Sequence, residues 1–164
     1  MWDQINKEAK LLYNNCSKNK IFVTTAESCT GGMIASSIVS ISGSSNIFKS
    51  SFVTYSNDMK TKLLKIPSEI IEINGAVSEV VAKNMAMNIL NILDSDISIA
   101  VTGIAGPGGG SKDKPVGLVW IGIGKKSSTI TKKYLFNGNR LQIRQKTTLE
   151  ALKLANFVIN NNRI

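Results

Sequence analysis

Apolar side chains recur near the start of the chain at intervals of three and four residues, from Trp2 through Ile5, Ala9 and Leu12 to Cys16. This spacing is typical of an amphipathic helix that buries one face. The same periodicity appears in the middle of the chain, after a serine cap, and again at its end. The pattern predicts helices over residues 2–16, 31–41, 57–64, 78–93 and 139–160.

Short apolar runs, bounded by small or polar residues, stand between these helices and predict about five strands. A hairpin-type turn over 124–127 joins the last two of them. The predicted strands cover residues 21–25, 52–55, 97–102, 116–123 and 129–136. Alternation of strand and helix, followed by two adjacent strands, predicts an α/β fold: a three-layer α/β/α sandwich with a mixed, mainly parallel sheet of about five strands.

The 164 residues are enough for one domain with its own core, and we expect a single domain over 1–164. No repeat, linker or low-complexity segment divides the chain. Ligands of such sheets bind at the carboxyl ends of the strands. Ser28, Tyr55 and Thr102 each stand at a predicted strand end, so we expect the site there.

The net charge of +9 is spread along the chain, without a block of basic residues and without interleaved aromatic side chains. A nucleic-acid partner is therefore not expected, although a positive field could steer an anionic metabolite to its pocket. No apolar run is long enough for a membrane helix, and the amino terminus does not resemble a signal peptide. Two cysteines without a disulfide pattern fit a reducing compartment. We expect a cytoplasmic protein without a membrane partner.

The chain contains no histidine. This excludes a Ser-His-Asp triad, a Cys-His pair and a histidine-ligated metal within one chain, so a nucleophile would need lysine, tyrosine, a carboxylate or a lowered pKa of its own. Cys16 falls on the apolar stripe of the first helix and is expected in the core. No compact acidic cluster is apparent, and we expect neither a metal nor another cofactor.

Two loops rich in small residues follow predicted strands, over 24–32 and 102–110. The first opens a helix, and the free N–H groups at a helix N-terminus can hold a developing oxyanion or a phosphate. The two loops together indicate a site for an anionic small molecule. The alternative is that each glycine cluster only reverses the chain.

Tyr55 and Lys60 stand at a strand-to-helix corner, where the helix is expected to be capped by Asn57 or Asp58. Such a corner can bring both side chains to the sheet edge that carries Ser28. A desolvated lysine amine can accept a serine proton, and a tyrosine can position or relay it. The alternatives are a surface lysine and a tyrosine that only packs at the strand end.

Five motifs that occur in order resemble the CinA C-terminal-domain family, also known as nicotinamide-nucleotide amidohydrolases. The motifs are Thr25-Ala26-Glu27-Ser28-Cys29-Thr30-Gly31-Gly32, Tyr55-Ser56-Asn57-Asp58-Met59-Lys60, Gly75-Ala76-Val77-Ser78, the run from Thr102 to Gly109, and Lys114-Pro115-Val116-Gly117. The resemblance covers nearly the whole chain. It implies hydrolysis of the carboxamide of nicotinamide mononucleotide to nicotinate mononucleotide and ammonia, in pyridine-nucleotide recycling.

The resemblance also implies roles for single residues: Ser28 as nucleophile, rather than Cys29, with Lys60 and Tyr55 assisting. Residues expected to bind the substrate are Thr30, Gly31, Gly32, Thr102, Gly103, Ala105, Gly106, Gly108, Arg140 and Arg144. Asn139 stands where the family has aspartate, which weakens an acidic role at that position. Each arginine suits either phosphate recognition or a structural role as a cap or subunit contact.

We expect a homo-oligomer, a dimer in the first place, and a stand-alone form without the nucleotide-processing domain to which the family is often fused. Two other functions stay open: a catalytically silent nucleotide-binding or competence-associated regulatory module, and a nucleic-acid partner. Nucleic-acid binding would weaken steeply with salt.

Overall fold

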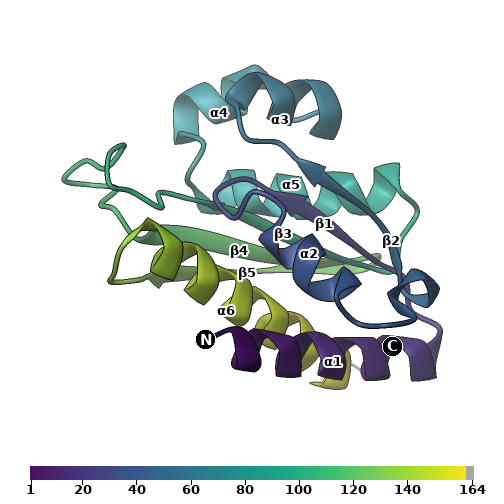
Figure 1. Ribbon diagram of the computed structural model, residues 1–164. Helices are drawn as coiled ribbons and strands as arrows, with labels where there is room; N and C mark the ends of the chain where they lie inside the picture. The colour runs from purple at the N-terminus through teal and green to yellow at the C-terminus, as the bar shows by residue number, and fades with distance from the viewer. Residues whose placement is uncertain (162–164) are drawn as a thin grey trace.

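The structure, a computed structural model, describes residues 1–161 (Figure 1). The helices are α1 (Trp2–Asn19), α2 (Met33–Val39), α3 (Asn57–Leu64), α4 (Ser68–Asn74), α5 (Glu79–Ile92) and α6 (Arg140–Asn161), with a 3-10 turn at Ser44–Asn46. The strands are β1 (Val23–Glu27), β2 (Phe48–Val53), β3 (Ile97–Gly103), β4 (Leu118–Lys125) and β5 (Ser128–Leu135).

The five strands form one sheet in the order β2-β1-β3-β4-β5. β1 pairs in parallel with β2 and β3, while β4 is antiparallel to both β3 and β5. Four of the strands therefore run in one direction and β4 runs against them. The predicted mixed, mainly parallel sheet is confirmed.

Helices cover both faces of the sheet, as Figure 1 shows: α1, α2 and α6 lie on one side and α3, α4 and α5 on the other. Two apolar clusters fill the space between the layers. β1 is buried at all five of its positions and β3 at six of its seven, which is why both read as continuous runs rather than as alternating patterns. The predicted three-layer α/β/α sandwich is confirmed.

The bounds of several elements differ from the sequence prediction; β1, for example, spans Val23–Glu27 instead of 21–25. The second strand spans Phe48–Val53 instead of 52–55, because its partner β1 ends at Glu27, which pairs with Val53. Tyr55 consequently lies beyond the strand rather than at its end. The short helix α4, which follows Pro67, was not predicted, since its seven residues span only two turns of periodicity.

The parallel strands β1, β2 and β3 end at the same edge of the sheet. Ser28 directly follows β1, Tyr55 follows β2 by two residues, and Thr102 is the penultimate residue of β3. The expected meeting of these three positions at one edge is confirmed. Among residues 1–161, no helix has the length and apolar character needed to cross a membrane.

Candidate active site

Ser28 is held in a sharp turn between β1 and α2. Its backbone N–H donates to the carbonyl of Val101 on β3 at 3.1 Å, and its own carbonyl accepts from Gly31 at 3.1 Å. Gly31 and Gly32 close the turn with φ values of 60° and 91°, a region that favours glycine. The serine is thereby fixed at a strand–turn–helix corner, with its side chain in the wall of a cavity.

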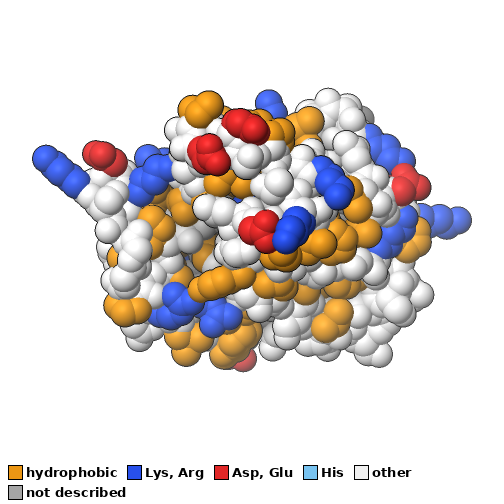
Figure 2. Space-filling view, turned by 90° about the horizontal axis from the view of Figure 1, so that it is seen from above, with side chains coloured by type: hydrophobic (Ala, Val, Ile, Leu, Met, Phe, Trp, Pro, Cys, Tyr) orange, Lys and Arg blue, Asp and Glu red, His pale blue; other side chains and the backbone are white. Residues whose placement is uncertain are grey.

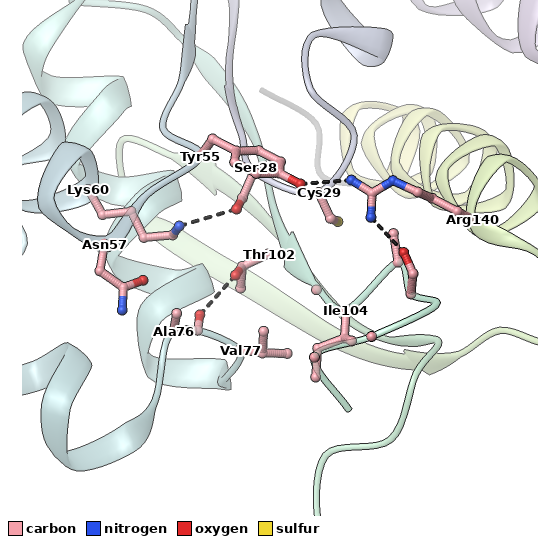
Figure 3. A pocket seen from close by; sticks show the side chains of 15 residues that line it. Ser28, Cys29, Tyr55, Asn57, Lys60, Ala76, Val77, Thr102, Ile104 and Arg140 are labelled. Carbon is pink, nitrogen blue, oxygen red and sulfur yellow. Dashed lines mark hydrogen bonds between the residues drawn. The ribbon is translucent and has the colours of Figure 1, made fainter. Parts of the chain in front are cut away.

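Lys60 of α3 is buried, and its side chain extends to that of Ser28 (Figure 3). Its Nζ lies 3.2 Å from Oγ of Ser28 and donates to the carbonyl of Thr54 at 3.0 Å. Only 1% of the lysine is exposed. Burial, which disfavours the charged form, lowers the pKa of Lys60 from its ordinary value of 10.5. The structure therefore pairs the hydroxyl with an amine that loses its proton more readily than a surface lysine does.

The helix that carries Lys60 is capped by Ser56, whose hydroxyl accepts from the N–H of Met59 at 3.2 Å. The expected cap at Asn57 or Asp58 is wrong, because these residues already belong to the first turn. The side chain of Asp58 instead pairs with Lys62 at 3.0 Å on the exposed face of α3. Lys60 and Lys62 thus lie on opposite sides of the helix, as their spacing predicts.

Cys29, next to Ser28, is a buried free thiol. Burial raises the pKa of Cys29 to about 12. Because the thiolate and not the thiol is the nucleophile, this cysteine is unreactive near neutral pH. The geometry favours the serine hydroxyl over the thiol.

Tyr55 lies at the rim of the cavity and is 60% exposed. Its hydroxyl accepts a hydrogen bond from Nη2 of Arg140 at 2.7 Å, and Nη1 of the same guanidinium donates to the carbonyl of Gly106 at 2.7 Å (Figure 3). Arg140, the first residue of α6, therefore bridges the tyrosine and the glycine-rich loop. With a lone pair taken by arginine, the Tyr55 hydroxyl keeps its own proton to donate.

The N-terminus of α2 is occupied by the carboxylate of Glu27, which is completely buried. This carboxylate accepts from the hydroxyl of Thr30 at 2.6 Å and from the backbone N–H groups of Gly32 at 2.9 Å, Ile34 at 3.1 Å and Ala35 at 2.8 Å. A carboxylate of the chain itself therefore occupies these three amides, which were expected to be free for an anion of the substrate.

Four residues expected to bind substrate lie outside the cavity wall as a result. Thr30 and Gly32 bond to Glu27, and the guanidinium of Arg144 donates to the carbonyl of Thr30 at 2.6 Å. A Cβ on Gly31 would lie 3.4 Å from the same guanidinium. Arg144 thus braces the turn that carries the nucleophile, which is the structural alternative for this arginine. Thr30, Gly31, Gly32 and Arg144 are absent from the lining of the cavity, and a role for them in substrate binding stays a prediction.

The cavity has a volume of about 260 Å³ and opens at the carboxyl edge of the sheet. It includes the other expected residues: Ser28, Tyr55, Lys60, Thr102, Gly103, Ala105, Gly106, Gly108 and Arg140. It also includes Cys29, Asn57, Ala76, Val77, Ile104 and Gly109, to which no binding role was assigned from the sequence. All six stand in the motifs that carry the family resemblance. Those motifs are the feature of the sequence from which their place in the cavity could have been predicted.

The charged residues in this wall, within the described part of the chain, are Lys60 and Arg140. No carboxylate side chain faces the cavity there, so its electrostatic potential favours an anionic ligand. Thr102 does not offer its hydroxyl proton to a ligand, since it donates to the carbonyl of Ala76 at 2.8 Å. The hydroxyl instead fixes the segment that contributes Ala76 and Val77 to the cavity wall.

We expect Glu27→Gln to lower the free energy of unfolding by about 2–4 kcal/mol, because the amide would place an N–H donor against backbone donors in a buried position. Chemical denaturation followed by circular dichroism measures this. Glu72→Gln on exposed α4 is the matched control and should change stability by no more than about 0.5 kcal/mol. Equal stabilities of the two variants would contradict the assigned role of Glu27.

Known proteins resemble this chain in both sequence and structure. A family model described as the CinA C-terminal domain matches residues 5–159. A CinA-like protein of Endomicrobium trichonymphae is 53% identical over 137 residues, which cover 84% of this chain and 32% of that protein. A CinA-like protein of Petrotoga mobilis is 47% identical over 137 residues, with 84% and 34% covered. The chain spans about a third of the length of these curated relatives.

Solved structures agree with the sequence comparison. The crystal structure of the competence/damage inducible protein CihA from Agrobacterium tumefaciens is 37% identical, with a TM-score of 0.93 and 96% of each chain covered. That of the competence damage-inducible protein A from Klebsiella pneumoniae is 29% identical, with a TM-score of 0.94 and with 97% of this chain and 99% of that chain covered. The chain therefore belongs to the CinA C-terminal domain family, as the five ordered motifs predicted.

Proposed function

We propose that this protein is an amidohydrolase that converts nicotinamide mononucleotide to nicotinate mononucleotide and ammonia, with Ser28 as nucleophile and Lys60 as base. The observation that supports this best is the 3.2 Å contact between the buried Nζ of Lys60 and Oγ of Ser28. In a chain without histidine, this pair is a means of activating a hydroxyl near neutral pH.

The reaction proceeds in two halves. Neutral Lys60 accepts the proton of Ser28 as Oγ attacks the carboxamide carbon, and the tetrahedral intermediate forms. The C–N bond then breaks, and the Lys60 ammonium returns the proton to the leaving nitrogen, which departs as ammonia. Water attacks the resulting ester while Lys60 accepts one of its protons. The ester bond breaks, and Oγ takes the proton back as nicotinate mononucleotide leaves.

The surroundings of Lys60 suit this cycle. The carbonyl of Thr54 accepts one N–H group of the amine at 3.0 Å and so holds Nζ beside Oγ of Ser28. Burial lowers the pKa of Lys60, and within the described residues no carboxylate bonds to its Nζ to oppose this shift. Tyr55, oriented by Arg140, can donate its proton to a group of the substrate at the rim of the cavity.

The charge of the cavity favours a nucleotide over free nicotinamide. Arg140 is a cationic side chain of the lining, no carboxylate among the described residues faces the cavity, and the chain carries a net charge of +9. These features favour a phosphate on the substrate. Arg140 is the residue of the wall whose guanidinium suits such a group.

We expect the specificity constant for nicotinamide mononucleotide to exceed those for nicotinamide riboside and nicotinamide by at least about tenfold, or about 1.4 kcal/mol of transition-state binding. Ammonia release measured with all three compounds tests this. Comparable specificity constants would contradict recognition of the phosphate. Binding of the mononucleotide without ammonia release would instead identify a catalytically silent nucleotide-binding module.

A further inference from the structure

The loop over residues 104–117 forms one wall of the cavity, and its prolines at 107 and 115 restrict only part of it. Glycine occupies 106, 108, 109 and 110, and glycine loses more conformational freedom than any other residue when it is ordered. At the base of the loop, Ile104 donates to Leu118 at 2.9 Å and Gly117 donates to Ile104 at 2.8 Å. These bonds close the loop, but they leave its glycine-rich part to be held by other contacts.

Two cationic side chains tie this loop to the helices on either side of it. Arg140 of α6 bonds to the carbonyl of Gly106, as described above. On the other side, Nζ of Lys114 donates to the carbonyl of Asn74, the last residue of α4, at 2.7 Å. Carbonyls at a helix C-terminus lack intrahelical partners and carry partial negative charge, so a lysine ammonium is a favourable partner for them.

The fit between Lys114 and the end of α4 is close. Gly75, which follows Asn74, has a φ of 73°, and a Cβ placed on it would lie 2.5 Å from Nζ of Lys114. The lysine is itself fixed in a turn, since its carbonyl accepts from the N–H of Ser111 at 2.9 Å and its N–H donates to the hydroxyl of Ser111 at 3.1 Å. Both ends of this contact are thus held in defined positions.

The contact joins two walls of the same cavity. The segment after α4 supplies Ala76 and Val77 to the lining, and Thr102 of β3 fixes this segment through the carbonyl of Ala76. Lys114 connects the glycine-rich loop to that anchored segment. If this contact opened, the two walls could separate while Ser28 and Lys60 keep their positions.

We propose that Lys114 is a positioning residue that holds the glycine-rich loop against the end of α4 and so preforms the substrate cavity. Ordering the loop before binding removes an entropic cost that the substrate would otherwise meet. The effect on catalysis rests on the proposed function. The effect on the loop itself does not, because hydrogen exchange in the loop can be measured without any turnover.

The first test measures amide hydrogen exchange in the segment 104–117 of the ligand-free protein, at the amides of Ile104, Ser111 and Gly117, which donate hydrogen bonds. Lys114→Met should speed exchange in this segment by at least about fivefold, because the loop then opens more often. Lys112→Met is the matched control: it removes the same charge from the same loop, but Lys112 is exposed and makes no hydrogen bond or ion pair within the described residues. Lys114→Arg should restore slow exchange. Equal exchange in Lys114→Met and wild type would overturn the proposal.

The second test uses steady-state ammonia release from nicotinamide mononucleotide. Lys114→Met should raise KM by about tenfold and change kcat by less than about threefold, since binding is weakened and the Ser28–Lys60 pair is intact. Lys112→Met should leave KM near the wild-type value. An equal rise of KM in both variants would assign the effect to lost charge and overturn the positioning role. Absence of activity in the wild type would contradict the proposed function. The exchange measurement would still decide whether the contact between Lys114 and Asn74 holds the loop in place.

Discussion

Replacing Ser28 by alanine should reduce ammonia release from nicotinamide mononucleotide by at least about 10⁴-fold while the protein stays folded. Oγ is the hydroxyl that lies against Nζ of Lys60, at 3.2 Å, and alanine removes it without adding volume to the cavity wall. Turnover measured at saturating substrate, with far-ultraviolet circular dichroism to verify the fold, tests this expectation.

Cys29→Ala provides the matched control, because the thiol is the neighbouring nucleophilic atom in the same wall. This variant should keep most of the activity, since a pKa of about 12 leaves the thiol protonated at neutral pH. Full activity in Ser28→Ala together with loss in Cys29→Ala would make the thiol the nucleophile and overturn the proposed mechanism.

Replacing Lys60 by methionine should lower kcat by about 10²- to 10⁴-fold, the range that general-base catalysis contributes. Methionine fills a similar volume but cannot accept the proton of Ser28. Lys62→Met is the control on the same helix and should be nearly normal, because Lys62 is exposed and pairs with Asp58 at the surface. Tyr55→Phe should fall between the two if the phenol orients or relays, and should match Lys60→Met if the phenol is itself essential.

The pH dependence follows from the direction of the lysine shift. Burial lowers the pKa of Lys60, so the neutral amine that acts as base is present above this lowered pKa and is lost as the pH falls through it. We therefore expect kcat/KM to decline toward acid, with the midpoint of this limb below 10.5. Lys60→Met should lack the limb. Near-wild-type turnover in Lys60→Met would refute the lysine base and leave tyrosinate as the candidate, because the carboxylate of Glu27 is occupied by backbone and hydroxyl donors.

Much of the architecture was predictable because it depends on local patterns. The buried strands β1 and β3 appear as continuous apolar runs, and Ser78 caps α5 by accepting from Val81 at 3.3 Å, as expected. The placement of Ser28 and Lys60 near the same edge of the sheet followed from topology, since parallel strands present their carboxyl ends at one edge. The 3.2 Å contact between the two side chains did not follow from it. The start of β2 was missed because Lys49, Ser50 and Ser51 interrupt its apolar pattern in an edge strand.

By itself, therefore, the sequence determined the layers, the sheet edge that carries the site, the family, and the absence of histidine chemistry. Only the tertiary structure decided which polar groups meet there. Glu27 rather than a ligand fills the N-terminus of α2, Arg140 reaches Tyr55 across 85 residues, and Lys114 reaches Asn74 across 40. The physical reason is that periodicity and turn chemistry act between neighbours in sequence. A hydrogen bond between distant side chains depends instead on how separate elements pack, which no local pattern encodes.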